Sequence, residues 1–199
     1  SDLITVVYTL TDDNEFVIDY KATTDKKTIV NLTHHAFFSP SGIEKDTASV
    51  ENNILTLNAD HYCPVDETSI PYGRIDHVEG TPMDFREPHV VGDRIDADHE
   101  QTKFGVGYDH CWVLNKREPG ELSFAAKCVE PNSGRVIECY TTEPGIQVYT
   151  GNFLDGTVTG KKGIVYNQRV GICLETQKYP DTPNKPEWPS AVLRPGEKY

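Results

Sequence analysis

The sequence contains no long apolar run, and this absence narrows what the protein can be. A membrane-spanning helix needs about 20 consecutive apolar residues, and no stretch of the chain approaches that length. No signal peptide, internal repeat or low-complexity tract is visible. Hydrophobic residues make up 37% of the 199 residues and charged residues 25%, as in ordinary globular proteins. We therefore expect one folded domain over residues 1–199, without a membrane partner.

Positively charged residues are fewer than negatively charged residues. The chain has 19 Lys and Arg against 31 Asp and Glu, which gives a net charge of −12. A surface of this sign repels nucleic acid and anionic lipid, and no basic stripe offsets the repulsion. The charge balance argues against a nucleic-acid partner and suits a neutral small molecule better.

Cysteine is infrequent and irregularly spaced. The five cysteines are Cys63, Cys111, Cys128, Cys139 and Cys173. Their odd number, wide spacing and lack of a C-x-x-C pair argue against a disulfide framework or a zinc site. We expect buried free thiols. Such thiols suit a reducing compartment, so we expect a cytoplasmic location.

Sustained helical periodicity is missing as well, and only Asp93–Glu100 could form a short turn of helix. The dominant hydrophobic period is two, which is typical of strands. Strand-like runs occupy residues 3–10, 16–22, 28–32, 54–58, 111–114, 122–129, 136–141, 146–151 and 171–175. Clusters rich in Pro, Gly, Asn and Ser separate them, and the polar cluster Thr11–Glu15 joins the first two into a β-hairpin. The pattern predicts an all-β protein, an antiparallel sandwich or barrel.

Three stretches far apart in the chain place polar groups inside apolar, strand-like runs. They are Asn31–His35, Gly107–His110 and Leu174–Gln177. A histidine, an aspartate and a glutamate in such settings are costly to bury without partners. Together they are the ingredients of an acid/base site.

His35 follows an apolar run and precedes Phe37 and Phe38, so we expect it at the end of a buried strand among aromatic rings. It could be a general acid, because histidine titrates closest to neutral pH. It could equally be a core histidine held by backbone hydrogen bonds. His34 should point to the opposite face of the strand.

Asp109 and Glu175 each allow two interpretations. Asp109 follows Gly105 and Gly107, which permit a close backbone approach or a positive φ, and it could cap its own turn or accept sugar hydroxyls. Glu175 continues an apolar run and could face solvent. If it is buried, desolvation raises its pKa towards that of a usable base, and Gln177 two residues on could orient it.

Other kinds of site are not supported by the sequence. The pair His34 and His35 lacks a third metal ligand at a suitable spacing. Asp12–Asn14 does not match a calcium loop, and no Gly-x-Ser-x-Gly elbow is present. We expect neither a metal nor a cofactor.

Motifs along the whole chain carry a resemblance to a known family. They are Tyr8–Glu15, Asn31–His35, Asn58–Tyr62, Pro64–Thr68, Glu79–Phe85, Gly107–His110, Ser133–Arg135, Tyr140–Gly145, Tyr149–Gly156, Leu174–Gln177 and Leu193–Gly196. With these motifs the chain resembles the C-terminal portion of the aldose 1-epimerases, or galactose mutarotases.

The resemblance implies a large antiparallel β-sandwich that binds a hexose in a cleft on its concave face. It implies interconversion of the α- and β-anomers of a free sugar such as galactose or glucose. His35 matches the family's general acid, Glu175 its general base, and Asp109 a carboxylate that binds sugar hydroxyls.

The chain also departs from the family pattern. The family usually has Asn where this chain has His34, and Ser-Tyr where it has Ala36 and Phe37. Family members carry an N-terminal segment with an arginine and a further histidine at the sugar, which we expect as a missing partner of this chain. Half a sandwich would expose sheet edges and apolar surface, which invites aggregation.

Three alternatives remain open beside the mutarotase hypothesis. One is a non-catalytic carbohydrate-binding module of the same fold. Another is a glycoside hydrolase that uses Asp109 and Glu175 as its carboxylate pair. The third is a relative that acts on a sugar phosphate, which the net charge disfavours.

Overall fold

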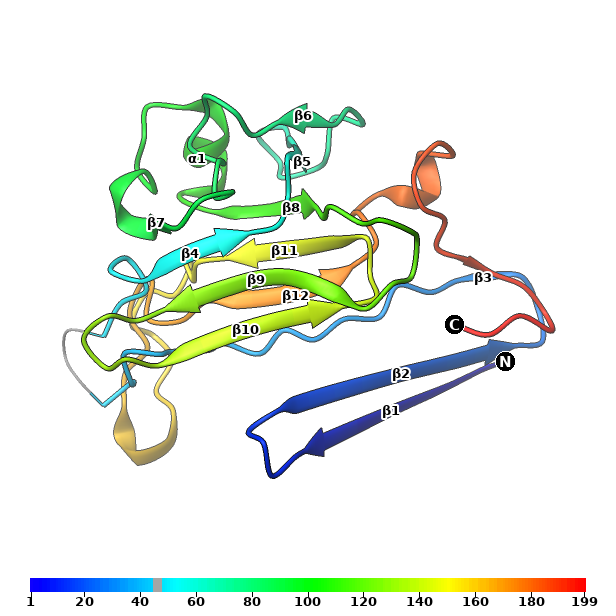
Figure 1. Ribbon diagram of the computed structural model, residues 1–199, viewed down its shortest axis with the longest axis horizontal. Coiled ribbons are helices and arrows are strands. Elements are labelled where there is room, and N and C mark those ends of the chain that lie inside the picture. Colours follow the sequence, from blue (N-terminus) through cyan, green and yellow to red (C-terminus); the bar gives the residue numbers. More distant parts are fainter. Residues whose placement is uncertain (45–47) are drawn as a thin grey trace. The chain divides into compact units, whose positions relative to one another are not determined.

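The computed structural model describes residues 1–44 and 48–199, and the regular secondary structure of this part of the chain consists almost entirely of strands (Figure 1). It divides into two compact units: unit 1 comprises residues 1–32 and 182–199, and unit 2 residues 33–181. The all-β prediction is confirmed, whereas the single-domain expectation stays a prediction. None of the described helices has the length and hydropathy to cross a membrane.

Unit 1 is a hairpin with a small second sheet. Strands β1 (Asp2–Leu10) and β2 (Phe16–Thr24) pair antiparallel, with Leu10 opposite Phe16, so the hairpin prediction is confirmed. Strand β3 (Thr28–Ile29) pairs with β13 (Val192–Leu193). Every residue of β1 is exposed, and such an apolar, uncovered strand is the kind of surface that favours aggregation.

Unit 2 contains two larger antiparallel sheets. The first has the strand order β10 (Val136–Thr141), β9 (Ser123–Val129), β4 (Ile54–Leu57), β7 (His89–Val90). The second has the order β12 (Cys173–Gln177), β11 (Gly145–Tyr149), β8 (Asp109–Val113), β5 (His61–Cys63), β6 (Asp76–His77). The strands predicted around residues 54, 111, 122, 136, 146 and 171 are all present within a few residues of their expected bounds.

One hydrophobic core joins the two sheets of unit 2, as a sandwich requires. Leu55 and Leu57 of the first sheet pack in the same fully buried cluster as Trp112, Val148 and Leu174 of the second. Burying a Leu or Val side chain contributes about 1.5–3 kcal/mol. This core fixes which face of the second sheet points inward.

Alternation along the strands gives the second sheet two different faces. Its core face carries His110, Trp112, Ile146, Val148 and Leu174. Its other face, here called the polar face, carries Asp109, Cys111, Gln147, Tyr149, Cys173 and Glu175. The candidate site residues Asp109 and Glu175 therefore share one face.

The helix prediction was wrong in its position. Helix α1 spans Glu100–Gly105, whereas Asp93 only closes the short 3-10 helix Val91–Asp93. The helix begins after His99, whose Nδ1 accepts a hydrogen bond from the Gln101 backbone N–H at 3.2 Å. The strands β5, β6, β7 and β13 were not predicted, because each has only two or three residues and shows no period.

The expected buried strand before His35 was also wrong. Strand β3 ends at Ile29, and residues 30–37 form no ladder with any described strand. Instead, Phe38 makes an isolated antiparallel bridge with Ile172, at the start of β12. The His35 side chain is 54% exposed.

Candidate active site

The polar face arranges its side chains in rows across neighbouring strands. Residues directly opposite each other in an antiparallel pair have Cβ atoms about 4.5–5.5 Å apart. One row runs Cys63, Cys111, Gln147, Glu175, and the next runs Asp109, Tyr149, Cys173. The two carboxylates thus belong to adjacent rows of one sheet.

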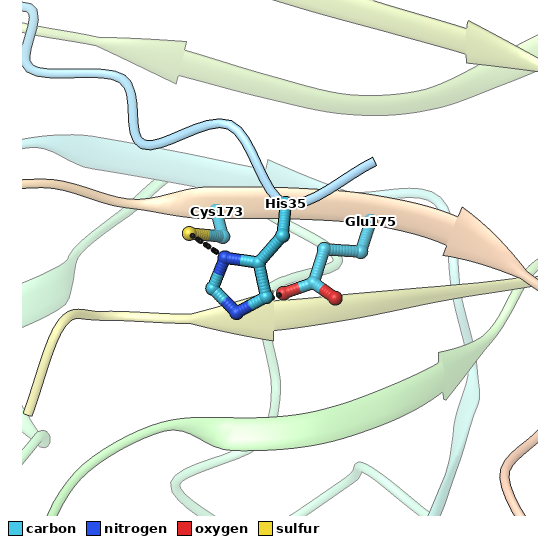
Figure 2. Close-up of side chains that lie close together, drawn as sticks. All are labelled: His35, Cys173 and Glu175. Atoms are coloured by element: carbon cyan, nitrogen blue, oxygen red, sulfur yellow. Dashed lines mark hydrogen bonds and ion pairs between the residues drawn. The ribbon is translucent and has the colours of Figure 1, made fainter. Parts of the chain in front are cut away.

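The extended segment that ends at Phe38 brings His35 to the polar face. Its Nε2 atom lies 3.4 Å from Oε1 of Glu175, and its Nδ1 atom lies 3.4 Å from Sγ of Cys173. Figure 2 shows the imidazole between these two side chains of β12. The segment is fixed to the same strand by two backbone hydrogen bonds between Phe38 and Ile172, of 2.8 and 2.9 Å.

Glu175 lies in a setting that favours its protonated form. Its side chain is only 11% exposed. Burial raises its pKa, the nearby Asp109 carboxylate raises it further, and His35 lowers it in part. The net direction is upward, and a carboxylate with a raised pKa is a stronger base. The two alternatives left by the sequence are thereby reduced to one, since Glu175 does not face solvent.

Asp109 is held by an amide from the adjacent strand. The Gln147 side chain donates an Nε2–H hydrogen bond to Asp109 Oδ1 at 2.9 Å. Burial raises the pKa of Asp109, while this hydrogen bond and the nearby His35 lower it in part. The other polar atom of Gln147, Oε1, is buried and has no hydrogen-bond partner among the described residues. Gln147 can therefore position Asp109 and still accept a hydrogen bond.

The turn before Asp109 depends on glycine. Gly107 has φ +131, a value that side chains rarely adopt, and a Cβ there would lie 2.4 Å from Oδ1 of Asn152. The Asn152 amide donates to the carbonyls of Gly105 and Tyr108 at 3.0 and 2.9 Å. Thr150 donates in turn to Asn152 Oδ1 at 2.7 Å. The positive φ expected in this stretch is confirmed for Gly107, and the turn places Asp109 at the first position of β8.

A buried arginine supports the same turn from outside the sheet. Arg169 forms ion pairs with Asp96 at 2.7 Å and Glu51 at 2.8 Å. It also donates to the carbonyl of Val106 at 3.0 Å. These bonds connect the turn to two acidic side chains and fix it more firmly than a surface loop.

Aromatic rings surround His35. Phe37 and Tyr149 lie 5.1 and 6.0 Å from the imidazole, measured between ring centroids. Phe37 is 46% exposed, whereas Phe38 packs against the core. His34 turns instead towards Phe38 at 6.3 Å, so the two histidines do contact different groups, as expected.

His35, Cys173 and Glu175 are also the one group of possible metal ligands that the described residues bring together, with ligand atoms within 4.8 Å of one another. However, His35 turns Nδ1 to the thiol and Nε2 to the carboxylate. A single ion could be bound by only one of these nitrogens, so the contacts fit a hydrogen-bonded chain better than a metal centre. The expectation of no metal stays a prediction.

One hollow of unit 2 lies away from these residues. It has a volume of about 390 Å³ and is lined by Thr56, Leu57, Asn58, Ala59, Asp60, Arg86, Asn115 and Phe124. Several of its polar groups bond to each other, as in the contact of Asn115 Nδ2 with Asp60 Oδ1 at 3.2 Å. The imidazole and the two carboxylates described above lie on the polar face, and none of them lines this hollow.

The structure therefore brings together all three residues singled out in the sequence. Gln147 and Cys173 were missed. Gln147 interrupts the apolar run Ile146–Tyr149, so the rule that found Glu175 could have found it. Cys173 gave no signal, because a cysteine in a buried strand is ordinary.

Fold and site define an antiparallel β protein that carries an imidazole–carboxylate pair on one sheet face. The chain is similar in sequence to galactose mutarotases and aldose 1-epimerases. It is 46% identical to mouse galactose mutarotase over 194 residues, covering 98% of this chain and 54% of that protein. It is 41% identical to the aldose 1-epimerase of Escherichia coli K12 over 197 residues, covering 98% and 55%.

Solved structures of epimerases and their homologues are also similar to this chain. A GalM/aldose epimerase homologue from C. elegans matches with a TM-score of 0.85 at 30% identity, over 100% of this chain and 57% of that one. A galactose 1-epimerase from Lactobacillus acidophilus matches with a TM-score of 0.78 at 29% identity, over 100% and 59%. The family model for aldose 1-epimerase matches residues 3–199. The chain belongs to the aldose 1-epimerase family, and it spans about half the length of the curated relatives it matches.

Proposed function

We propose that the protein is an aldose 1-epimerase, which interconverts the α- and β-anomers of a free hexose such as galactose or glucose. The observation that carries this proposal is the 3.4 Å contact between His35 Nε2 and Glu175 Oε1 in a chain of this family. The relatives named above are described as mutarotases or epimerases, so they lend no support to a non-catalytic module.

The closeness of acid and base suits ring opening. The two oxygens that exchange protons in this reaction, the C1 hydroxyl and the ring oxygen, are bonded to one carbon. An acid and a base that serve them must therefore be neighbours. An inverting glycosidase instead spaces its carboxylates about 6.5–9.5 Å apart to admit a water.

The reaction follows from these positions. Glu175 takes the proton of the C1 hydroxyl while His35 gives its Nε2 proton to the ring oxygen. The bond between C1 and the ring oxygen breaks, and the open aldehyde forms. Rotation about C1–C2 presents the other carbonyl face, the two groups exchange roles, and the ring closes as the opposite anomer. The pair is back in its starting protonation state after each turnover.

The surrounding residues supply binding. Asp109 accepts hydrogen bonds from sugar hydroxyls, and the Gln147 amide holds the Asp109 carboxylate in place for them. Phe37 offers an exposed ring to the apolar face of the sugar. No step requires a metal or a cofactor.

The test is Glu175→Gln in the full protein. A general base contributes about 10²–10⁴-fold, so we expect mutarotation followed by polarimetry to slow by that factor. The matched control is Glu138→Gln, an exposed glutamate of β10 paired with Lys127, which should leave the rate unchanged. Near-normal mutarotation by the Glu175 variant would remove Glu175 from the base role.

Two finer points belong to the same proposal. The N-terminal segment implied by the resemblance, with its arginine and histidine, would complete the sugar site, and the intact mass of the natural protein tests whether it exists. We also propose the cytoplasm as the compartment. The observation in favour is that all five cysteines are free.

A further inference from the structure

Two residues near the turn before Asp109 adopt a backbone conformation that is unfavourable for them. Val106 has φ 53 and ψ 32, and Arg169 has φ 61. A positive φ is uncommon outside glycine, and for a β-branched residue such as valine it is an outlier. Strain of this kind persists only where the surrounding structure holds it, and it is concentrated at functional sites. The conformation of Val106 therefore requires contacts that hold it.

Val106 occupies the position after helix α1 that glycine normally fills. Its backbone N–H donates to the Lys103 carbonyl, and the Gly107 N–H donates to the Thr102 carbonyl at 2.8 Å. These two bonds form the Schellman motif, in which the left-handed residue is usually glycine. Because this residue is a valine, the two bonds are opposed by the strain of its backbone.

Arg169 supplies a further contact with the strained residue. Its Nη2 donates to the Val106 carbonyl at 3.0 Å. The guanidinium is itself fixed, because it pairs with Asp96 at 2.7 Å and Glu51 at 2.8 Å and is only 7% exposed. The Arg169 backbone is fixed as well, since its N–H donates to the Gly151 carbonyl at 3.0 Å. A rigid, charged donor thus binds the carbonyl of the strained valine.

The turn that starts at Val106 sets the direction of the Asp109 carboxylate. Asp109 lies three residues after Val106 and is the first residue of β8. One side of the turn is held by the Asn152 amide, which donates to the Tyr108 carbonyl at 2.9 Å. The other side is held by Arg169. Without the arginine, Val106 could relax towards a negative φ, and this rotation would redirect Asp109.

We propose that Arg169 is a positioning residue, which keeps this turn in its strained form and thereby directs the Asp109 carboxylate at the sugar hydroxyls. This inference rests on the proposed function and deepens it. The acid and the base are held separately, because the segment of His35 has its own bridge to the sheet and Glu175 belongs to β12. The loss of an interaction made equally with substrate and transition state raises KM and leaves kcat unchanged. We therefore expect the effect of Arg169 in KM.

The main variant is Arg169→Met in the full protein, which keeps a long side chain and removes every donor. Its two acidic partners are 45% and 73% exposed, so water can solvate them and no buried charge is left unpaired. We expect KM for galactose or glucose to rise about 2–10-fold, the range that corresponds to one hydrogen bond, with little change in kcat. The matched control is Arg86→Met, which also loses its bonds to two carboxylates, those of Asp84 and Glu79, and should leave KM unchanged.

Val106→Gly separates positioning from simple stabilisation. Glycine adopts a positive φ without strain, so the turn would no longer need the arginine. In the double variant Val106→Gly, Arg169→Met we expect the KM of Val106→Gly alone. An unchanged KM in Arg169→Met, or a rise that Val106→Gly does not remove, would overturn the positioning role. If Arg169→Met does not fold, Asp96→Asn weakens the hold on the guanidinium at an exposed site and is judged by the same two comparisons.

Hydrogen exchange of the Gly107 amide in the full, sugar-free protein gives a readout that does not depend on activity. We expect faster exchange in Arg169→Met, unchanged exchange in Arg86→Met, and in both variants an unchanged Phe38 amide, which reports the segment of His35. Equal exchange at Gly107 in the wild type and Arg169→Met would contradict the role whatever the polarimeter shows. Failure of the mutarotase proposal itself would appear instead as a normal rate in Glu175→Gln.

Discussion

The two faces of the sheet β12-β11-β8-β5-β6 place titratable groups in opposite situations. On the core face, burial lowers the pKa of His110 to about 3 and keeps it neutral, so it acts as a packing residue. On the polar face, burial raises the pKa of Glu175 and Asp109. The same physical effect thus makes a histidine inert on one face and gives a carboxylate the strength of a base on the other.

The faces also differ in what their side chains contact. Trp112 is fully buried against Phe85 and Tyr108, and its indole N–H donates to the Met83 carbonyl at 2.9 Å. Glu175 on the opposite, polar face instead lies close to the half-exposed His35. We infer that the core face sets the stability of unit 2 and that the polar face sets its chemistry. Three substitutions test this contrast.

The largest effect should come from the core face. Trp112→Ala removes a fully buried ring, and such changes cost about 3–5 kcal/mol. We expect a lower urea midpoint or unfolding in the full protein. The comparison variant is Gln147→Ala on the polar face, which should keep most of the stability and lose sugar affinity in calorimetry. Similar losses of stability in both variants would contradict the inference that the core face sets the stability of unit 2 and the polar face its chemistry.

An intermediate effect on stability should come from the turn that precedes Asp109. Gly107→Ala would place a Cβ against Asn152 at a strained φ, and strain of this kind costs about 1–3 kcal/mol. We expect a lower melting temperature together with weaker sugar binding, because Asp109 follows this turn. Gly134→Ala is the control, since it also has a positive φ but meets no atom within 4 Å. The difference between the two variants reports the contact with Asn152 together with the more strained φ of Gly107.

The smallest effect should be a gain in thermal stability. Because the pKa of Glu175 is raised in the folded protein, its stabilising contribution is present at acid pH and is lost as the pH rises through the folded value. Glu175→Gln should therefore raise the melting temperature at neutral pH, and the gain should vanish in acid.

Glu130 provides a control of opposite sign. Hydrogen bonds from Ser133 and Asn132 lower its pKa to about 2, so its contribution is present at neutral pH and lost as the pH falls towards that value. Glu130→Gln should accordingly destabilise the fold at neutral pH. If calorimetric scans showed both variants shifting in the same direction, the pKa argument for Glu175 would be wrong.

Much of this architecture could be predicted from period-two patterns. The longer strands and the position of Glu175 at the end of an apolar run follow from alternation and from the cost of burying charge, whereas the strand of Asp109 was expected to begin only at Cys111. The strands β5 to β7 could not be found, because two or three residues define no period. The position of His35 beside Glu175 could not be found either, since its segment is fixed by a bridge between Phe38 and Ile172, a residue 134 positions beyond Phe38.

The chemical roles of the site residues were predicted from a different source. Polar residues in apolar runs indicated a site, but the assignment of acid, base and sugar ligand came from the family resemblance. Cys173 shows the limit of both approaches. Its contact with His35 appears only in the structure, where Sγ lies 3.4 Å from Nδ1 of the imidazole.

The bridge between Phe38 and Ile172 has a consequence for protein engineering. Because it fastens the histidine-bearing segment to the strand that carries the glutamate, the two groups form a single transplantable module. Moving residues 33–38 alone into another scaffold would leave the imidazole without its anchor. A designer who wishes to borrow this pair would have to transfer residues 33–38 and 172–175 as one cassette.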